Sequence, residues 1–287
     1  MRVFVVQTNP QEDKTKNVAQ AFSLVRIAAQ QGAEIVVLPE MFSFMGADAD
    51  RFQNADFLGQ GVFAELADLA KTCGIYLVGG SHGERPVQGS EAQLASRKIH
   101  NTSQTFSPAG EVVATYRKVH LFNLRSRSGQ SEFKEADHYL AGQPPQSTFE
   151  LKGKGQVWQA LTLICYDLRF PEIFRQETML QKPPDVVFLP AAFTYRTGLA
   201  HWEVLLRARA IENHCYIVAC NQTGFFAGGQ KRNFGHSLVV SPWGEIKLNA
   251  CEDVGTWGCE IDLQEVAAAR AQIPALENRV VGIGKRN

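Results

Sequence analysis

Cys165 is the residue whose type and position most clearly suggest chemistry. It ends the apolar run 160–164 and precedes the mixed segment 166–172. Such a run predicts a buried strand, and reactive side chains of α/β proteins gather where strands end. A thiol there could attack a carbonyl carbon and form a thioester. Because most free cysteines are small buried hydrophobic residues, as expected for Cys215 and Cys220, position alone makes Cys165 only a candidate nucleophile.

Two charged residues follow other predicted strands. Glu40 comes directly after the apolar segment 35–39, and Lys118 lies at the far end of a predicted hairpin strand. A carboxylate among apolar neighbours can act as a general base, and an ammonium group can stabilise a thiolate or an oxyanion. Taken singly, a solvated loop glutamate and a solvated edge lysine are the more ordinary interpretations. The case for a catalytic site therefore depends on their combination with Cys165.

Three segments, in this order along the chain, carry a resemblance to a known family. They are 37–40 (Val-Leu-Pro-Glu), 116–122 (Tyr-Arg-Lys-Val-His-Leu-Phe) and 164–172 (Ile-Cys-Tyr-Asp-Leu-Arg-Phe-Pro-Glu). They resemble the glutamate, lysine and cysteine boxes of the nitrilase superfamily of carbon–nitrogen hydrolases, and the likeness extends from Val3 to about Ile283. The resemblance implies a catalytic triad formed by Glu40, Lys118 and Cys165.

The resemblance also implies a role for each residue of the site. Glu40 would accept the thiol proton of Cys165, and Lys118 together with the backbone N–H of Tyr166 would hold the oxyanion. Glu135 would correspond to the second glutamate of the family and orient the lysine or a water molecule. This chemistry requires neither a metal nor an organic cofactor.

The residues after the nucleophile bear on the substrate. Nitrile-cleaving members of the family typically carry Trp-Glu there, whereas this chain has Tyr-Asp at 166–167. The segments 169–172 and 200–212 look most like the branch that contains deaminated-glutathione amidase and ω-amidase, although the chain departs from it around 123–130 and 181–184. The likeness implies that a small linear amide such as deaminated glutathione is hydrolysed to a carboxylic acid, with release of ammonia. α-Ketoglutaramate and N-carbamoyl compounds are the alternative substrates.

Arg169 has two open interpretations. Its planar guanidinium could bind a substrate carboxylate through two hydrogen bonds. It could equally form a structural ion pair with Asp167 or Glu172, which lie close to it in the sequence. Substrate binding and a structural role therefore have equal weight for this residue.

Two competing hypotheses concern the whole protein. A Cys–His hydrolase could use His120, His201 or His236 as its base, but none of them lies in a papain-type or caspase-type signature. A binding or scaffold protein could keep the fold without turnover, because fold alone does not imply activity. The intact glutamate, lysine and cysteine count against the second hypothesis.

The elements that must position these side chains alternate between strands and helices. We expect strands at 2–7, 34–38, 75–80, 99–106, 111–117, 159–165, 185–189 and 215–221, and helices at 15–31, 62–72, 171–181 and 199–212. Each half also carries a Ser-Pro-x-Gly-Glu turn, at 107–111 and 241–245. Two such halves predict one α/β domain over 1–287, a four-layer αββα sandwich with its helices outside. The segment 123–157 is expected to be a long functional loop.

Composition and charge exclude several classes of protein. The 287 residues include 45% hydrophobic and 20% charged residues, as in globular domains, and the formal net charge is zero. Zero charge argues against nucleic acid and acidic membranes as partners. Nothing approaches the ~18 apolar residues of a membrane helix, and no signal peptide is evident at the start. We therefore expect a cytoplasmic enzyme that acts on a small molecule.

Some remaining patterns carry less weight. The six cysteines contain no Cys-x-x-Cys pair, so neither a disulfide framework nor a zinc site is implied. Two glycosylation sequons, 101–103 and 221–223, are ascribed to chance. The apolar stripe Leu199, Trp202 and Leu206 predicts either ordinary core packing or a surface for a homodimer, which members of the family usually form.

Overall fold

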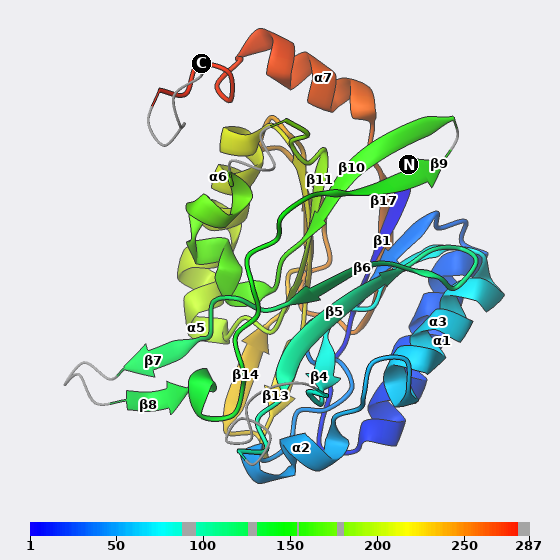
Figure 1. Ribbon diagram of the computed structural model, residues 1–287, viewed down its shortest axis with the longest axis vertical. Coiled ribbons are helices and arrows are strands. Elements are labelled where there is room, and N and C mark those ends of the chain that lie inside the picture. The colour runs from blue at the N-terminus through cyan, green and yellow to red at the C-terminus, as the bar shows by residue number, and fades with distance from the viewer. Residues whose placement is uncertain (88–95, 126–130, 154, 177–180, 281–287) are drawn as a thin grey trace.

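Two β-sheets face each other and helices cover their outer faces in the computed structural model, which describes residues 1–87, 96–125, 131–153, 155–176 and 181–280 (Figure 1). Between the sheets, Val5 and Val37 of one pack in the same core cluster as Trp158 and Phe188 of the other. Alternate residues of these strands point outward and bury against helices. The predicted four-layer αββα sandwich is confirmed.

The first sheet has the strand order β17-β1-β2-β3-β5-β4, and β6 pairs with β5. Its strands are β1 Arg2–Gln7, β2 Ile35–Val37, β3 Tyr76–Val78, β4 His82–Glu84, β5 His100–Phe106, β6 Val112–Arg117 and β17 Gly255–Glu260. Helices α1 (Lys14–Gln30) and α3 (Gly61–Cys73) cover its outer face. The late strand β17 runs antiparallel to β1, so segments from the two ends of the chain share this sheet.

The second sheet has the order β16-β15-β12-β11-β10-β9. Its strands are β9 Phe149–Gly153, β10 Gln156–Thr162, β11 Val186–Ala191, β12 Tyr216–Asn221, β15 Leu238–Val240 and β16 Ile246–Asn249. Its outer face packs against α6 (Glu203–Asn213). Because β10, β11 and β12 are parallel, their carboxyl ends lie at one edge of the sheet.

Short elements connect the layers. They are the helices α2 Arg51–Asn54, α5 Tyr195–Thr197 and α7 Leu263–Gln272, the 3₁₀ turns η1 Asp48–Asp50, η2 Glu135–Asp137, η3 Cys165–Arg169 and η4 Pro171–Phe174, the π-helical turn η6 Gly198–Trp202, and the hairpins β7 Asn123–Arg125 with β8 Ser131–Lys134 and β13 Thr223–Phe226 with β14 Lys231–Phe234. Among the described residues, no helix has both the length and the apolar character needed to cross a bilayer.

Two predictions for the middle of the chain were wrong. The segment 123–157 contains the hairpin β7–β8, the turn η2 and strand β9, so it is not one long loop. The helix expected over 171–181 is only a 3₁₀ turn as far as residue 174, and 177–180 lie outside the described residues. Tertiary contacts override helix propensity here, because Ile173 and Phe174 are both buried in the core and the Arg175 guanidinium binds the Asn213 side chain of α6.

The apolar stripe near α6 divides between core and surface. Trp202 and Leu206 are fully buried against the second sheet, whereas Leu199 is 64% exposed. Core packing is therefore the correct interpretation for Trp202 and Leu206. Both sequons are also buried, since Asn101 and Asn221 are at most 1% exposed.

Candidate active site

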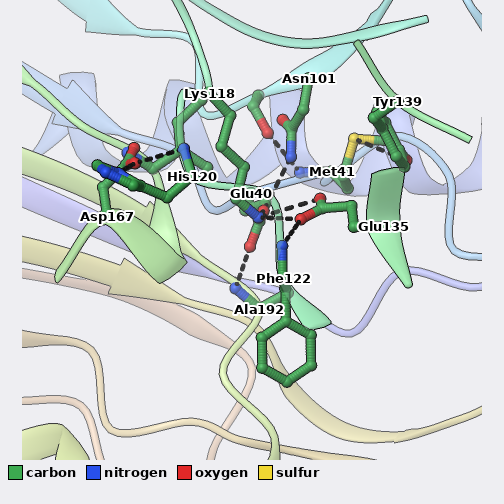
Figure 2. A network of polar contacts seen from close by, with 12 residues as sticks. Glu40, Met41, Asn101, Lys118, His120, Phe122, Glu135, Tyr139, Asp167 and Ala192 are labelled. Carbon is green, nitrogen blue, oxygen red and sulfur yellow. Dashed lines mark hydrogen bonds and ion pairs between the residues drawn. The ribbon is translucent and has the colours of Figure 1, made fainter. Parts of the chain in front are cut away.

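A buried lysine joins two buried glutamates (Figure 2). The Lys118 ammonium lies 2.9 Å from Glu40 Oε1 and 2.9 Å from Glu135 Oε2. All three side chains are at most 7% exposed. Two carboxylates and one ammonium give this cluster a formal charge of −1, and such a cluster is stable in a dry interior only because its members pair closely.

The ends of strands place these side chains together. Glu40 lies three residues after β2, and Lys118 directly follows β6. Glu135 begins η2, where its Oε2 accepts a 2.6 Å hydrogen bond from the Phe122 N–H. Strands β2 and β6 both belong to the first sheet, where β6 pairs with β5, so one sheet supplies both Glu40 and Lys118.

The backbone around Glu40 is tightly held. Its carbonyl oxygen accepts a 2.6 Å hydrogen bond from the Gln222 side chain, and the next N–H, that of Met41, donates to the Ser81 hydroxyl at 2.9 Å. Met41 has a φ of 47°, a left-handed conformation that is unfavourable for a residue with a side chain. Non-glycine residues adopt this conformation stably only when their surroundings fix them. The hydrogen bonds from Gln222 and to Ser81 therefore hold this turn in place.

Cys165 lies at a second turn of the same kind. Strand β10 ends at Thr162, not at the cysteine as predicted, and Cys165 begins the turn η3 with a φ of 46°. The chain leaves the strand early because the buried Asp167 carboxylate accepts a 3.0 Å hydrogen bond from the Ile164 N–H and so closes the turn. Glu40 and Lys118 both lie close enough to the thiol to act on its pKa.

Burial and the Glu40 carboxylate raise the pKa of the Cys165 thiol well above its ordinary value, and the Lys118 ammonium lowers it by less. The sulfur is therefore a thiol at neutral pH. For Lys118, burial by itself lowers the pKa, but Glu135, Glu40 and Cys165 together hold it well above its ordinary value. A neutral thiol beside a carboxylate and a permanent cation is an arrangement in which the carboxylate must remove the proton before the sulfur can attack.

The three histidines considered as alternative bases have other partners. His120 Nδ1 lies 2.7 Å from Asp167 Oδ1, its ring stacks on Phe170, and Figure 2 shows it turned away from Glu40. His201 contacts the Arg169 guanidinium, and His236 contacts Asn249. The structure describes Cys165 and all three histidines, and none of the histidines forms a hydrogen bond with Cys165.

Tyr166 and Arg169 both belong to η3. No described protein group accepts a hydrogen bond from the Tyr166 N–H, so it is available to an oxyanion. The Arg169 guanidinium lies 5.1 Å from the centre of the Phe193 ring and 5.9 Å from that of Tyr166, and it forms no ion pair with Asp167 or Glu172, which the structure also describes. The structural ion pair that was one interpretation of Arg169 is therefore wrong.

Sequence reasoning missed several groups that hold the site. The Asn101 side chain donates to Glu40 Oε1 at 2.8 Å, and the Ala192 N–H donates to Glu40 Oε2 at 2.9 Å. Asp167 accepts from the Tyr116 hydroxyl at 2.7 Å and from His120, so it links the turn of the cysteine to the strand of the lysine. The sequence did carry a signal for Tyr116 and His120, because one lies two residues before Lys118 and the other two residues after it.

The model of one protein family, described as carbon–nitrogen hydrolase, matches residues 2–271. The chain belongs to the carbon–nitrogen hydrolase family. Among its relatives, this hydrolase is 34% identical to deaminated glutathione amidase from Synechocystis sp., with 96% of each chain covered. It is 35% identical to omega-amidase NIT2 from Danio rerio, with 97% of this chain and 94% of the relative covered. These matches confirm the family and the enzyme class predicted from the sequence.

Solved structures agree with the fold of this carbon–nitrogen hydrolase. The C. elegans NitFhit protein superposes with a TM-score of 0.81 and 31% identity over 97% of this chain and 64% of the NitFhit chain. A mutant amidase from Nesterenkonia sp. AN1, with acrylamide added at its active-site cysteine, superposes with a TM-score of 0.71 and 25% identity over 96% of this chain and 98% of its own. Both neighbours thus share nearly the whole of the architecture described above.

Proposed function

We propose that this carbon–nitrogen hydrolase cleaves the amide of a small carboxylic acid through a thioester on Cys165. The observation that carries the proposal is the Lys118 ammonium, which is buried between Glu40 and Glu135 and acts on the titration of the nearby thiol. The fold does not require this ionic cluster, because replacing a whole buried ion pair by apolar side chains often costs little net stability. The position of the ammonium beside a nucleophile suits stabilisation of developing negative charge.

In the first half of the reaction, the thiol proton of Cys165 moves to the Glu40 carboxylate while the sulfur bonds to the amide carbonyl carbon. The resulting oxyanion is stabilised by the Lys118 ammonium and the Tyr166 N–H. The tetrahedral intermediate then collapses, the C–N bond breaks, and the proton held by Glu40 passes to the leaving nitrogen. The products of this half are the thioester and either ammonia or an amine.

In the second half, Glu40 removes a proton from a water molecule, whose oxygen attacks the thioester carbonyl carbon. The C–S bond breaks, the carboxylic acid leaves, and the proton returns to the sulfur of Cys165. Glu135 keeps the Lys118 ammonium in place through both halves, because it accepts from that ammonium and is itself held by the Phe122 N–H. One carboxylate thus serves as base twice and as acid twice.

We propose that Arg169 recognises a carboxylate of the substrate. Its guanidinium is half-buried beside two aromatic rings and forms no ion pair with Asp167 or Glu172. Its two terminal nitrogens share the single acceptor His201 Nδ1, at 3.3 and 3.4 Å, so most of its five N–H donors remain for a substrate. Relatives named deaminated glutathione amidase make deaminated glutathione the first candidate substrate. The relative named omega-amidase NIT2 makes α-ketoglutaramate the second.

Hydrolysis of deaminated glutathione, α-ketoglutaramate, an N-carbamoyl compound and a nitrile tests the proposal. A primary amide releases ammonia and a substituted amide releases an amine, so the acid product should be measured by mass spectrometry in every case. Cys165→Ala should abolish turnover without unfolding the protein, and a covalent adduct of acyl mass should be found on the wild-type chain after acid quenching. Absence of acid product from every amide would favour a binding or scaffold protein instead.

We also propose a homodimer formed through the outer face of α6. Val204 and Ile211, which lie seven residues apart on one face of that helix, are 68% and 47% exposed. Gly244 lies against Ile211, and its chain neighbour Trp243 is 49% exposed. Burying them against a second copy would remove these apolar side chains from water. Val204→Asp should yield a monomer in analytical ultracentrifugation, whereas Val112→Asp, at an exposed position of β6, should not. A monomeric wild-type protein would contradict the proposal.

A single domain over 1–287 and a cytoplasmic location complete the proposal. The pairing of β17 with β1 supports one domain, because it joins distant segments of the chain in one sheet. One cooperative unfolding transition is expected, and two separate transitions would contradict it. Cell fractionation tests the location.

A further inference from the structure

The Glu40 carboxylate has an uneven set of hydrogen-bond donors. Its Oε1 accepts from Asn101 Nδ2 at 2.8 Å and from Lys118 Nζ at 2.9 Å. Its Oε2 accepts from a single hydrogen-bond donor among the described residues, the Ala192 N–H at 2.9 Å. Each carboxylate oxygen can accept about two hydrogen bonds. Oε1 is therefore saturated, and Oε2 retains the one open position.

Asn101 contacts both charged members of the site. Its side chain binds Glu40, and its backbone carbonyl accepts a 2.9 Å hydrogen bond from the Lys118 N–H. The residue lies in β5 and is 1% exposed, so neither contact competes with bulk water. Because a carboxylate only accepts hydrogen bonds, the amide nitrogen of Asn101 must be the atom that faces it.

The other side-chain atom of Asn101 argues against a purely structural role. Its Oδ1 is buried and has no hydrogen-bond partner among the described protein groups. A buried carbonyl oxygen without a partner lowers stability, so a residue retained only for the fold would be better replaced by an apolar one. The side chain is oriented for what it donates to Glu40.

We propose that Asn101 is a positioning residue that, together with Lys118, occupies Oε1 of Glu40 and so reserves Oε2 for the proton of Cys165. The proposal rests on the proposed function, in which Glu40 is the base. The Ala192 N–H, at the end of β11, lies close enough to act on both Glu40 and the Cys165 sulfur. The thiol proton is therefore assigned to Oε2, the oxygen that shares the Ala192 N–H with the sulfur.

Four titratable groups face Glu40 and must be considered in any pH measurement. Lys118 follows β6, Cys165 begins η3, Glu135 begins η2, and Tyr139 follows η2. Burial and Glu135 raise the pKa of Tyr139, although Arg51 opposes them, so the tyrosine is neutral at working pH. Lys118 is protonated and Cys165 is a thiol in the same range. The tyrosine, the lysine and the thiol therefore keep their protonation states on the acidic limb of a rate profile.

The test compares Asn101→Ala with Gln104→Ala, which removes an amide from the opposite face of the same strand, where it binds Thr115. The readout is the pH dependence of Cys165 alkylation by acrylamide, followed by intact mass, so it needs no substrate. Loss of a donor favours the protonated form of Glu40, and the acidic limb should therefore move up by about one pH unit in Asn101→Ala only. On any amide that is turned over, kcat should fall about 100-fold with little change in KM.

A double variant keeps the proposal falsifiable. In a Glu40→Gln background, Asn101→Ala should not slow alkylation further, because the base through which it acts is gone. An additive effect there, or equal shifts in Asn101→Ala and Gln104→Ala, would overturn the proposal. If Asn101→Ala does not fold, Asn101→Ser keeps a polar group that is too short to reach Oε1 and gives the same comparison. Failure to hydrolyse any amide would leave the alkylation result unchanged, so the two proposals fail separately.

Discussion

Replacing Lys118 by methionine removes its ammonium and keeps a side chain of similar length. In the wild-type protein that ammonium lies 2.9 Å from oxygens of both Glu40 and Glu135. If it also stabilises the oxyanion, Lys118→Met should lower kcat by about 10²–10³-fold or more, equivalent to about 2.7–4 kcal/mol of transition-state stabilisation. The loss should be evident in a single turnover, because acyl transfer itself is slowed.

The same variant should lose stability for a different reason. Glu40 and Glu135 are 4% and 6% exposed, so removing the cation leaves two unpaired buried carboxylates. Breaking a buried pair in this way typically costs about 3–5 kcal/mol. Lys118→Met/Glu135→Gln removes one of the two uncompensated charges, and it should therefore regain much of the stability and none of the activity.

Urea unfolding and single-turnover kinetics on the same preparations separate these effects. His120→Ala is the matched control, because its imidazole lies two residues away on the chain and binds Asp167, so its loss in kcat should be much smaller. An inactive His120→Ala beside an active Lys118→Met would show that the histidine is the catalytic residue. Recovery of activity in the double variant would show that the lysine acts only through stability.

Three further outcomes are expected. Glu40→Gln should slow alkylation of Cys165, because the pKa of that thiol is raised and Glu40 must remove its proton. The alkylation rate of the exposed Cys251, followed in the same peptide mass mapping, should not change. Equal alkylation rates at Cys165 in the wild-type protein and the variant would contradict this expectation. Arg169→Lys should lower kcat/KM mainly for amides that bear a carboxylate, because lysine lacks the planar fork, and an equal loss on uncharged amides would exclude recognition of that group. Burial raises the pKa of Cys215 from 9.0 to about 12. The unfolded thiol therefore ionises first, and stability that is complete below pH 9 falls by about 1.4 kcal/mol per pH unit as the pH rises towards 12. Cys215→Ala should reduce that slope in urea unfolding, and an unchanged slope would refute the assignment.

The local elements were determined largely by the sequence. A continuous apolar run predicted β1 at 2–7 and helical spacing predicted α1 at 15–31, and the structure has Arg2–Gln7 and Lys14–Gln30. These patterns succeed because burial leaves a local signal: α1 buries one face at helical spacing, whereas β1 is buried on both faces and is apolar throughout its centre. The three family boxes likewise fixed the enzyme class, since short segments carry the residue types on which the chemistry depends.

The tertiary structure decided how the residues of the site meet. Asn101 lies 61 residues from Glu40 in the chain, and Ala192 lies 152 residues from it, yet both donate to the same carboxylate. No local pattern encodes such contacts, because they depend on the register of β5 and on the way the two sheets pack. The left-handed turn at Cys165 and the protonation of its thiol have the same origin. Both follow from a buried environment to which Asp167, Glu40 and Lys118 contribute together, and desolvation of this kind is a property of the assembled interior and not of any one segment.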